Sequence, residues 1–140
     1  WLQLKQEIGI EILYIPLDEG GRLDLAEAKK MLSNARVKIF SIAHASNALG
    51  IIHPIRDLIK IAREKNIITI VDAAQSVAHM AIDVKDLNCD FLVFSGHKMY
   101  GPTGIGVLWG RRELLEMMPP FLGGGEMIRE VSQEAFSVKE

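Results

Sequence analysis

The sequence of 140 residues contains one cysteine, Cys89, and only 6% aromatic residues. A single cysteine excludes an internal disulfide framework and a cysteine-based metal cluster, and it is typical of proteins from a reducing compartment. An excess of basic residues is also missing, since 16 lysines and arginines stand against 18 aspartates and glutamates. Because phosphate backbones are bound by clustered basic side chains, we expect no nucleic-acid partner.

Long hydrophobic runs are absent too. Apolar stretches such as 67–71 are far shorter than the roughly 20 residues that span a bilayer, and no leader-like segment opens the chain. These absences predict a cytoplasmic protein that does not associate with membranes. The chain opens at Trp1, within what reads as the end of a helix, so we expect it to be part of a longer protein.

What the sequence does contain is an alternation of helical and strand-like patterns. Apolar residues recur at helical spacing in 2–8, 25–32, 55–62 and 111–118, and strand-like apolar runs occupy 10–17, 37–43, 67–71, 91–94 and 105–109. This alternation predicts an α/β fold, with a mostly parallel sheet flanked by helices. Only the ten residues 95–104 separate the last two strands, which is too few for a parallel crossover, so we expect the last strand to be antiparallel.

Polar residues collect directly after three of these strands, in the segments 44–47, 72–76 and 95–98. Ligands of such sheets bind beyond the carboxyl ends of the strands, so this convergence predicts a binding site. Taken alone, Asp72 is explained as well by a structural role, as a turn former or a helix cap, as by a role in the binding site. Lys98, taken alone, is explained as an ordinary solvated lysine.

The surroundings of Lys98 favour a chemical role. Segment 95–106 places a serine, a histidine and four glycines around the lysine. No Lys-Ser or Lys-Thr pair follows the glycines, which disfavours a nucleotide phosphate loop. A nucleophilic lysine must be able to lose its proton, and burial or a covalent bond to a cofactor allows this. A lysine together with an aspartate at a neighbouring strand end is the minimum set for pyridoxal phosphate, whose ring acts as an electron sink.

Segments 44–50, 71–75 and 95–106 resemble the pyridoxal-phosphate core of the cysteine desulfurases in the class V aminotransferase superfamily. Segment 118–128 is similar to their group II branch, the SufS-like enzymes. The resemblance implies the fold of the type I transferases that depend on pyridoxal phosphate. Residues 1–118 would then be the central part of the large, cofactor-binding domain, and residues 119–140 an irregular, glycine-rich active-site or interface segment.

The resemblance also implies a role for six residues. Lys98 would bond covalently to the cofactor and move a proton at the substrate α-carbon, and Asp72 would pair with the pyridine nitrogen. Gln75 and Asn47 would contact the ring hydroxyl of the cofactor, and Ser95 and His97 would bind its phosphate.

The other three histidines receive no catalytic role. His44 has no role in this resemblance, and His53 and His79 are interpreted as structural or surface residues.

By the same resemblance, the complete enzyme would convert L-cysteine to L-alanine and pass the sulfur, held as a persulfide, to an acceptor protein for iron–sulfur cluster assembly. A homodimer is expected, and no metal. Cys89 directly precedes a predicted buried strand and is interpreted as a small core residue. Because the persulfide needs a reactive cysteine, we expect these 140 residues alone to be inactive.

Two alternative functions stay open. The first is another class V enzyme, such as a selenocysteine lyase, an aminotransferase or an epimerase, and the second is a non-catalytic interaction domain. The choice between cysteine and selenocysteine stays open.

Overall fold

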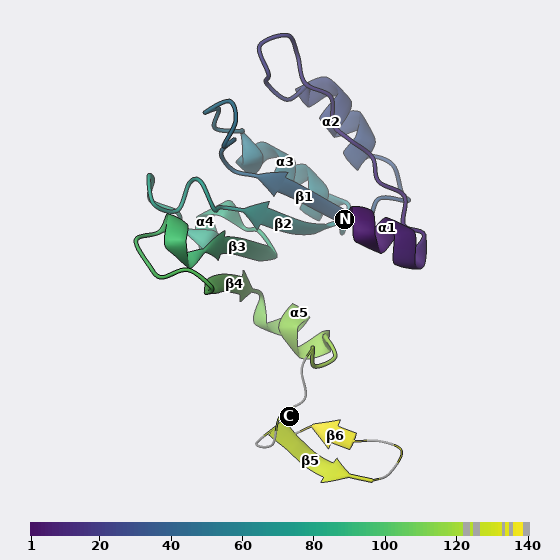
Figure 1. Ribbon diagram of the computed structural model, residues 1–140. Helices are drawn as coiled ribbons and strands as arrows, with labels where there is room; N and C mark the ends of the chain where they lie inside the picture. Colours follow the sequence, from purple (N-terminus) through teal and green to yellow (C-terminus); the bar gives the residue numbers. More distant parts are fainter. Residues whose placement is uncertain (122–123, 125–126, 133, 135, 139–140) are drawn as a thin grey trace.

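The computed structural model describes residues 1–121, 124, 127–132, 134 and 136–138 (Figure 1). Its helices are α1 (Leu2–Ile8), α2 (Leu25–Leu32), α3 (Ile55–Glu64), α4 (Val84–Leu87) and α5 (Arg112–Met117), with one 3-10 turn, η1 (Gly96–Lys98). Its strands are β1 (Ile39–Ala43), β2 (Ile68–Asp72), β3 (Phe91–Ser95), β4 (Gly106–Gly110), β5 (Ile128–Val131) and β6 (Phe136–Val138).

Four strands form one sheet in the order β1-β2-β3-β4. β1, β2 and β3 are parallel, while β4 runs antiparallel to β3, with Ser95 opposite Gly106. The predicted α/β fold, the mostly parallel sheet and the single antiparallel strand are therefore confirmed. β5 and β6 pair with each other in a separate antiparallel ladder.

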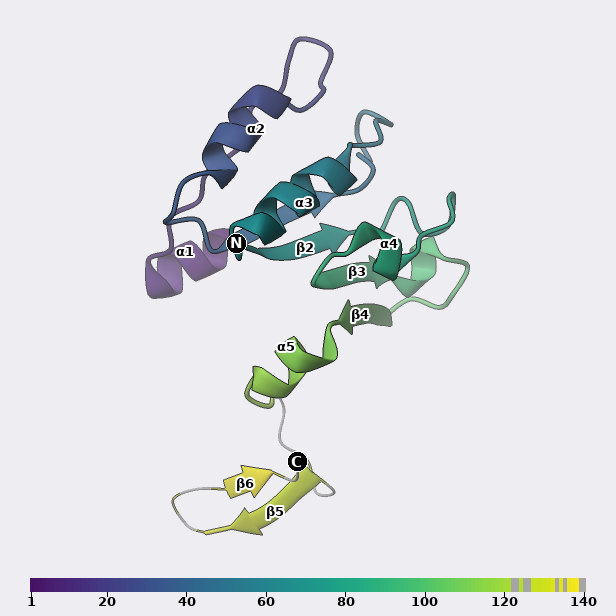
Figure 2. The same ribbon diagram turned by 180° about the vertical axis from the view of Figure 1, so that it is seen from behind.

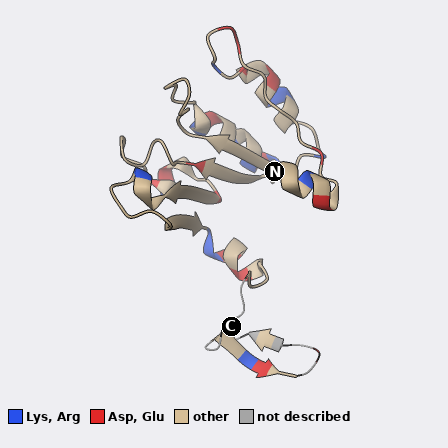
Figure 3. Cartoon of the chain, viewed as in Figure 1, with Lys and Arg blue, Asp and Glu red and all other residues tan. Residues whose placement is uncertain are grey.

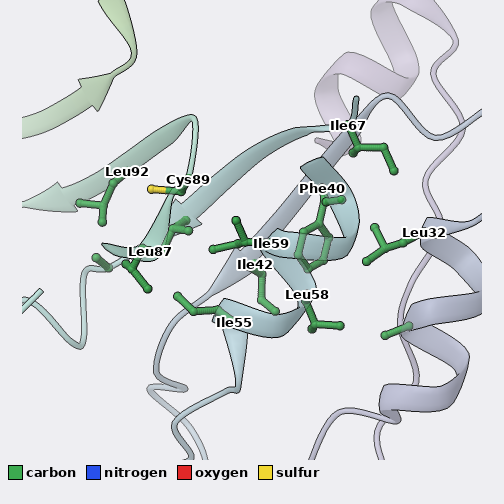
Figure 4. Close-up of a cluster of buried hydrophobic side chains, with 14 residues drawn as sticks. Leu32, Phe40, Ile42, Ile55, Leu58, Ile59, Ile67, Leu87, Cys89 and Leu92 are labelled. Atoms are coloured by element: carbon green, nitrogen blue, oxygen red, sulfur yellow. The ribbon is translucent and has the colours of Figure 1, made fainter. Parts of the chain in front are cut away.

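Helix α3 covers one face of the sheet, as the ribbon shows from both sides (Figures 1 and 2). Its apolar residues follow helical spacing, and Leu58 and Ile59 are each only 1% exposed. They share a core with Phe40 and Ile42 of β1 (Figure 4). Leu87 of α4 belongs to the same core, so α3 and α4 pack on the same side. Burial of this apolar face is the main force that holds helices and sheet together.

The opposite face of the sheet is much more open. Burial alternates along β1, where Ile39, Ser41 and Ala43 are exposed while the residues between them are buried. Leu108 of β4, which pairs with Val93, is 56% exposed. Because paired residues of neighbouring strands point to the same face, register assigns Ala43, Asp72 and Val93 to this open face.

The structure differs from the sequence prediction in three segments. Residues 10–17 form no strand, only an isolated bridge between Leu17 and Leu23, because no neighbouring segment of the described chain pairs with them. Helix α4 was not predicted; its four residues are too few to show a period, although Asp83 caps it by accepting from the N–H of Lys85. Segment 119–140 was expected to be irregular but contains β5 and β6.

Charged side chains of both signs are spread over the helices and loops (Figure 3). The four strands of the main sheet, in contrast, carry a single charged residue, Asp72. None of the helices in the described ranges has the length and apolar character needed to cross a membrane.

Candidate active site at the carboxyl ends of the parallel strands

The carboxyl ends of the three parallel strands meet at one edge of the sheet. Ala43, the last residue of β1, pairs with Asp72, the last residue of β2, and Asp72 pairs with Val93 near the end of β3. The main-chain N–H of Ala73 then donates to the carbonyl of Val93 at 2.9 Å. The three polar segments identified in the sequence therefore start side by side, as predicted.

Asp72 is held firmly at this edge. Its carbonyl accepts from the N–H of His44 at 2.8 Å, and its Oδ1 accepts from the N–H of Ala74 at 2.9 Å. The turn-forming interpretation of Asp72 is thus correct for one carboxylate oxygen. The other oxygen, Oδ2, has no hydrogen-bond partner among the described residues, and the side chain is exposed. Asp72 can therefore accept a further hydrogen bond from a ligand without losing its structural role.

Lys98 ends the 3-10 turn that directly follows β3. Its side chain is exposed, and its amine forms no hydrogen bond or ion pair with any described residue. The turn is tight because Gly96 donates to the carbonyl of Ile105 at 2.8 Å and accepts from both Met99 and Gly101 at 2.9 Å. A Cβ on Gly96 would lie 2.8 Å from Ile105 Cγ2 and 3.0 Å from its carbonyl oxygen. The chain beside Lys98 therefore requires glycine for close approach of the backbone.

The other four predicted residues lie on the same strand ends. Ser95 is the last residue of β3 and, by register, points to the same face as Val93 and Asp72. Ser95 and Gln75 are half-buried, whereas Asn47 and His97 are exposed. Their side chains make no hydrogen bond within the described part of the chain, and no direct bond links any two of the six residues. These side chains therefore lie near the same edge of the sheet, and they contribute no hydrogen bond that stabilises the described part of the fold.

These residues fit pyridoxal phosphate by the chemistry of their free groups. A carboxylate oxygen without a partner suits a protonated ring nitrogen, and a free amine suits an aldehyde carbon. A hydroxyl, an imidazole and a glycine-rich turn that allows close backbone approach suit a phosphate. The described residues contain no group of three or more His, Cys, Asp and Glu side chains placed to hold a metal ion.

A cavity of about 310 Å³ lies next to this edge, where the chain leaves the end of β1. It is lined by His44 and His53, by the start of α3, by residues 80–83 and by Asp86 and Leu87 of α4. None of the six predicted residues lines it. The sequence analysis assigned no function to His44 or His53, and no signal in the sequence indicates that the two imidazoles face one cavity.

Comparisons with known proteins identify the family of the chain. The family model described as aminotransferase class-V matches residues 1–140. The chain belongs to the class V aminotransferase family. It is 48% identical over 132 residues to a cysteine desulfurase of Pectobacterium carotovorum subsp. carotovorum (strain PC1). The apo structure of a cysteine desulfurase from Thermococcus onnurineus NA1 matches all of the chain with a TM-score of 0.89 and 44% identity.

A second solved structure, the cysteine desulfurase CsdA from Escherichia coli, covers 99% of this family member with a TM-score of 0.89 and 40% identity. These relatives are much longer. The chain spans 32% of the Pectobacterium protein and 35% of each of the two solved chains. The comparisons therefore establish the family and the fold of this segment.

Proposed function

We propose that this chain supplies the lysine and the ring-binding residues of a cysteine desulfurase that depends on pyridoxal phosphate. The observation that supports this proposal most strongly is the placement of Asp72 and Lys98. Asp72 is the last residue of β2, Lys98 ends the turn that follows the neighbouring parallel strand β3, and each offers an unpartnered functional group. Identities of 40–48% to cysteine desulfurases over nearly the whole chain favour this activity over the alternatives.

In this proposal, five residues have one task each and Lys98 has two. Pyridoxal phosphate supplies an electron sink for the bonds at the α-carbon of the substrate. Asp72 Oδ2 holds the proton on the ring nitrogen. Lys98 Nζ holds the cofactor covalently and later moves a proton at the α-carbon. The residues that position the cofactor are Gln75 and Asn47 at the ring hydroxyl, and Ser95 and His97 at the phosphate.

The overall reaction balances if a thiol takes up the sulfur: L-cysteine and a thiol give L-alanine and a persulfide. Cys89 does not suit this step, because its side chain is fully buried on the helix-covered side of the sheet. The accepting thiol therefore comes from a residue other than Cys89.

We further propose that the enzyme belongs to the SufS-like branch, acts as a homodimer, and passes the sulfur to an acceptor protein in the cytoplasm. The similarity to the group II branch in segment 118–128 supports the branch, although residues 122, 123, 125 and 126 lie outside the described residues.

The test compares Lys98→Ala with Lys60→Ala in the complete enzyme, of which we propose that these 140 residues are one segment. Lys60 is an exposed lysine on α3, away from the strand ends, and serves as the matched control. With pyridoxal phosphate and L-cysteine, we expect the native protein and Lys60→Ala to show the visible absorbance of bound cofactor and to form alanine. Lys98→Ala should lose both. Equal cofactor binding by all three proteins would contradict the proposal and favour an interaction domain. Faster turnover of selenocysteine than of cysteine would favour a selenocysteine lyase.

A further inference from the structure

His44 and His53 stand on either side of the loop 44–53, which connects β1 to α3 and contains Asn47. The N–H of His53 donates to the carbonyl of His44 at 2.9 Å, which closes the base of the loop. The N–H of His44 donates in turn to the carbonyl of Asp72 at 2.8 Å. Two hydrogen bonds therefore connect the base of the loop to Asp72, the residue proposed to bind the ring nitrogen.

The two imidazoles are unusual in this fold. Within the described ranges, only two buried side-chain polar atoms lack a hydrogen-bond partner, and they are Nδ1 of His44 and Nδ1 of His53. Both side chains line the same cavity of about 310 Å³. Each Nδ1 atom can therefore take up a proton without breaking a hydrogen bond to another described residue.

A charge on the His44 ring would be costly in the closed loop. Burial lowers the pKa of His44, and the nearby His53 lowers that pKa further by charge repulsion. Three other charged groups face the cavity, but all three are engaged. Arg56 of α3 is paired with Asp86 of α4, and Asp83 accepts from the N–H groups of Lys85 and Asp86 at the start of α4. Asp72 meets the pair only through its carbonyl.

We propose that His44 and His53 are a positioning pair at the base of the loop 44–53, and that protonation of His44 opens this loop and so weakens the hold of Asn47 and Asp72 on the cofactor. The part that concerns the cofactor rests on the function proposed above. The opening of the loop itself rests only on the geometry of the pair.

The direction of the effect follows from linkage. In the open loop, His44 is solvated and titrates near the ordinary value of 6.5, whereas in the closed loop its pKa is lower. The open form therefore binds more protons as the pH falls below about 6.5. The opening equilibrium shifts by up to about tenfold per pH unit for each proton taken up, until the closed form is protonated as well. At a pH above the ordinary histidine value, His44 is neutral and the loop stays closed.

The experiment measures hydrogen–deuterium exchange of residues 44–53 in the full chain between pH 5.5 and 8, expressed as protection relative to the unstructured peptide. His44→Gln removes the ring whose pKa is lowered by burial, and His79→Gln removes an exposed histidine outside the cavity and serves as the control. We expect protection to fall at low pH in the native protein and in His79→Gln, and to fall at least fivefold less in His44→Gln. The same fall in all three proteins would overturn the proposal.

Binding of pyridoxal phosphate over the same pH range gives the second readout. We expect affinity to decrease below pH 6.5 more steeply in the native protein than in His44→Gln, with both similar at pH 8. Equal pH profiles would overturn the link between the pair and the cofactor site. If Lys98-dependent binding is absent at every pH while loop protection still responds, the proposed function fails and the proton-sensitive loop is supported. Thermal unfolding at pH 8 verifies that the variants fold.

Discussion

Asp90 and Thr69 exchange three hydrogen bonds inside the fold. The N–H and Oγ1 of Thr69 donate to Asp90 Oδ2 at 2.8 and 2.9 Å, and the N–H of Asp90 donates to Thr69 Oγ1 at 2.9 Å. The remaining oxygen, Oδ1, accepts from Arg63 and lies 3.0 Å from Nε of Arg111. The Asp90 side chain, only 8% exposed, is thus satisfied on both oxygens and connects α3, β2 and the end of β4.

We expect Asp90→Ala to lower the free energy of unfolding by about 3 kcal/mol, because it leaves two partly buried guanidinium groups and Thr69 without their partner. Asp86→Ala is the matched control. It breaks an ion pair with Arg56 in which both side chains are more than half exposed, so its cost should stay below about 1 kcal/mol. Urea unfolding of the full chain measures both, and similar losses would contradict the structural role assigned to Asp90.

A second prediction separates the two oxygens of Asp72. Asp72→Asn keeps an Oδ1 acceptor for the N–H of Ala74 but removes the negative charge. Stability should change by less than about 0.5 kcal/mol, as for a surface substitution. Formation of alanine from cysteine should fall about 100-fold or more, because the charge opposite the ring nitrogen is lost.

Asp18→Asn is the control for this change, since Asp18 Oδ1 likewise accepts from a turn N–H, that of Arg22, at 2.8 Å. It should affect neither stability nor activity. Native-like alanine formation by Asp72→Asn would show that the carboxylate serves the turn alone.

A third prediction concerns the turn that positions Lys98. In Gly96→Ala, the new Cβ meets the side chain and the carbonyl of Ile105. We expect a cost of about 1–3 kcal/mol from overpacking and a weaker affinity for pyridoxal phosphate, because the displaced turn includes Lys98. Gly104→Asn is the comparison, because Gly104 has φ +80° with open space around it, and asparagine tolerates this conformation. Its cost should be about 1 kcal/mol or less, and an equal loss of cofactor affinity in both variants would rule out the steric explanation.

Much of the fold was predictable because its signals are local. Asp24 caps α2 with bonds to the N–H groups of Ala26 and Glu27, and α3 shows its buried stripe directly in its spacing. Segment 10–17 was mispredicted because its composition suits a strand, whereas a strand also requires a partner. The sequence cannot show whether that partner is present.

The candidate site was predictable for a related reason. Parallel strands bring their carboxyl ends together, so Asp72 and Lys98 were expected at one edge from chain order alone. The His44–His53 pair was not, because it depends on how the loop folds back on itself. The hydrogen bond that closes the loop joins the main-chain N–H of His53 to the main-chain carbonyl of His44. Such a bond does not depend on side-chain type, so the sequence carries no pattern that predicts it.

The last prediction concerns Cys89, the single cysteine of the sequence. Its side chain is fully buried, and burial raises the pKa of the thiol. Because the thiolate is the reactive form, Cys89 should resist alkylation at pH 8 in the folded protein and react readily in urea. Mass spectrometry of the peptide that contains Cys89 measures both states.

The Cys89→Ala variant then decides whether this thiol takes part in the reaction. We expect it to lose about 1 kcal/mol of stability, as for the removal of one buried heavy atom, and to keep native formation of alanine from cysteine and native release of sulfide when an added thiol reduces the persulfide. Loss of sulfide release in Cys89→Ala, with the cofactor still bound through Lys98, would make Cys89 the sulfur acceptor. That result would contradict our assignment of Cys89 to the core, because a fully buried thiol can reach a substrate only if the surrounding strands separate.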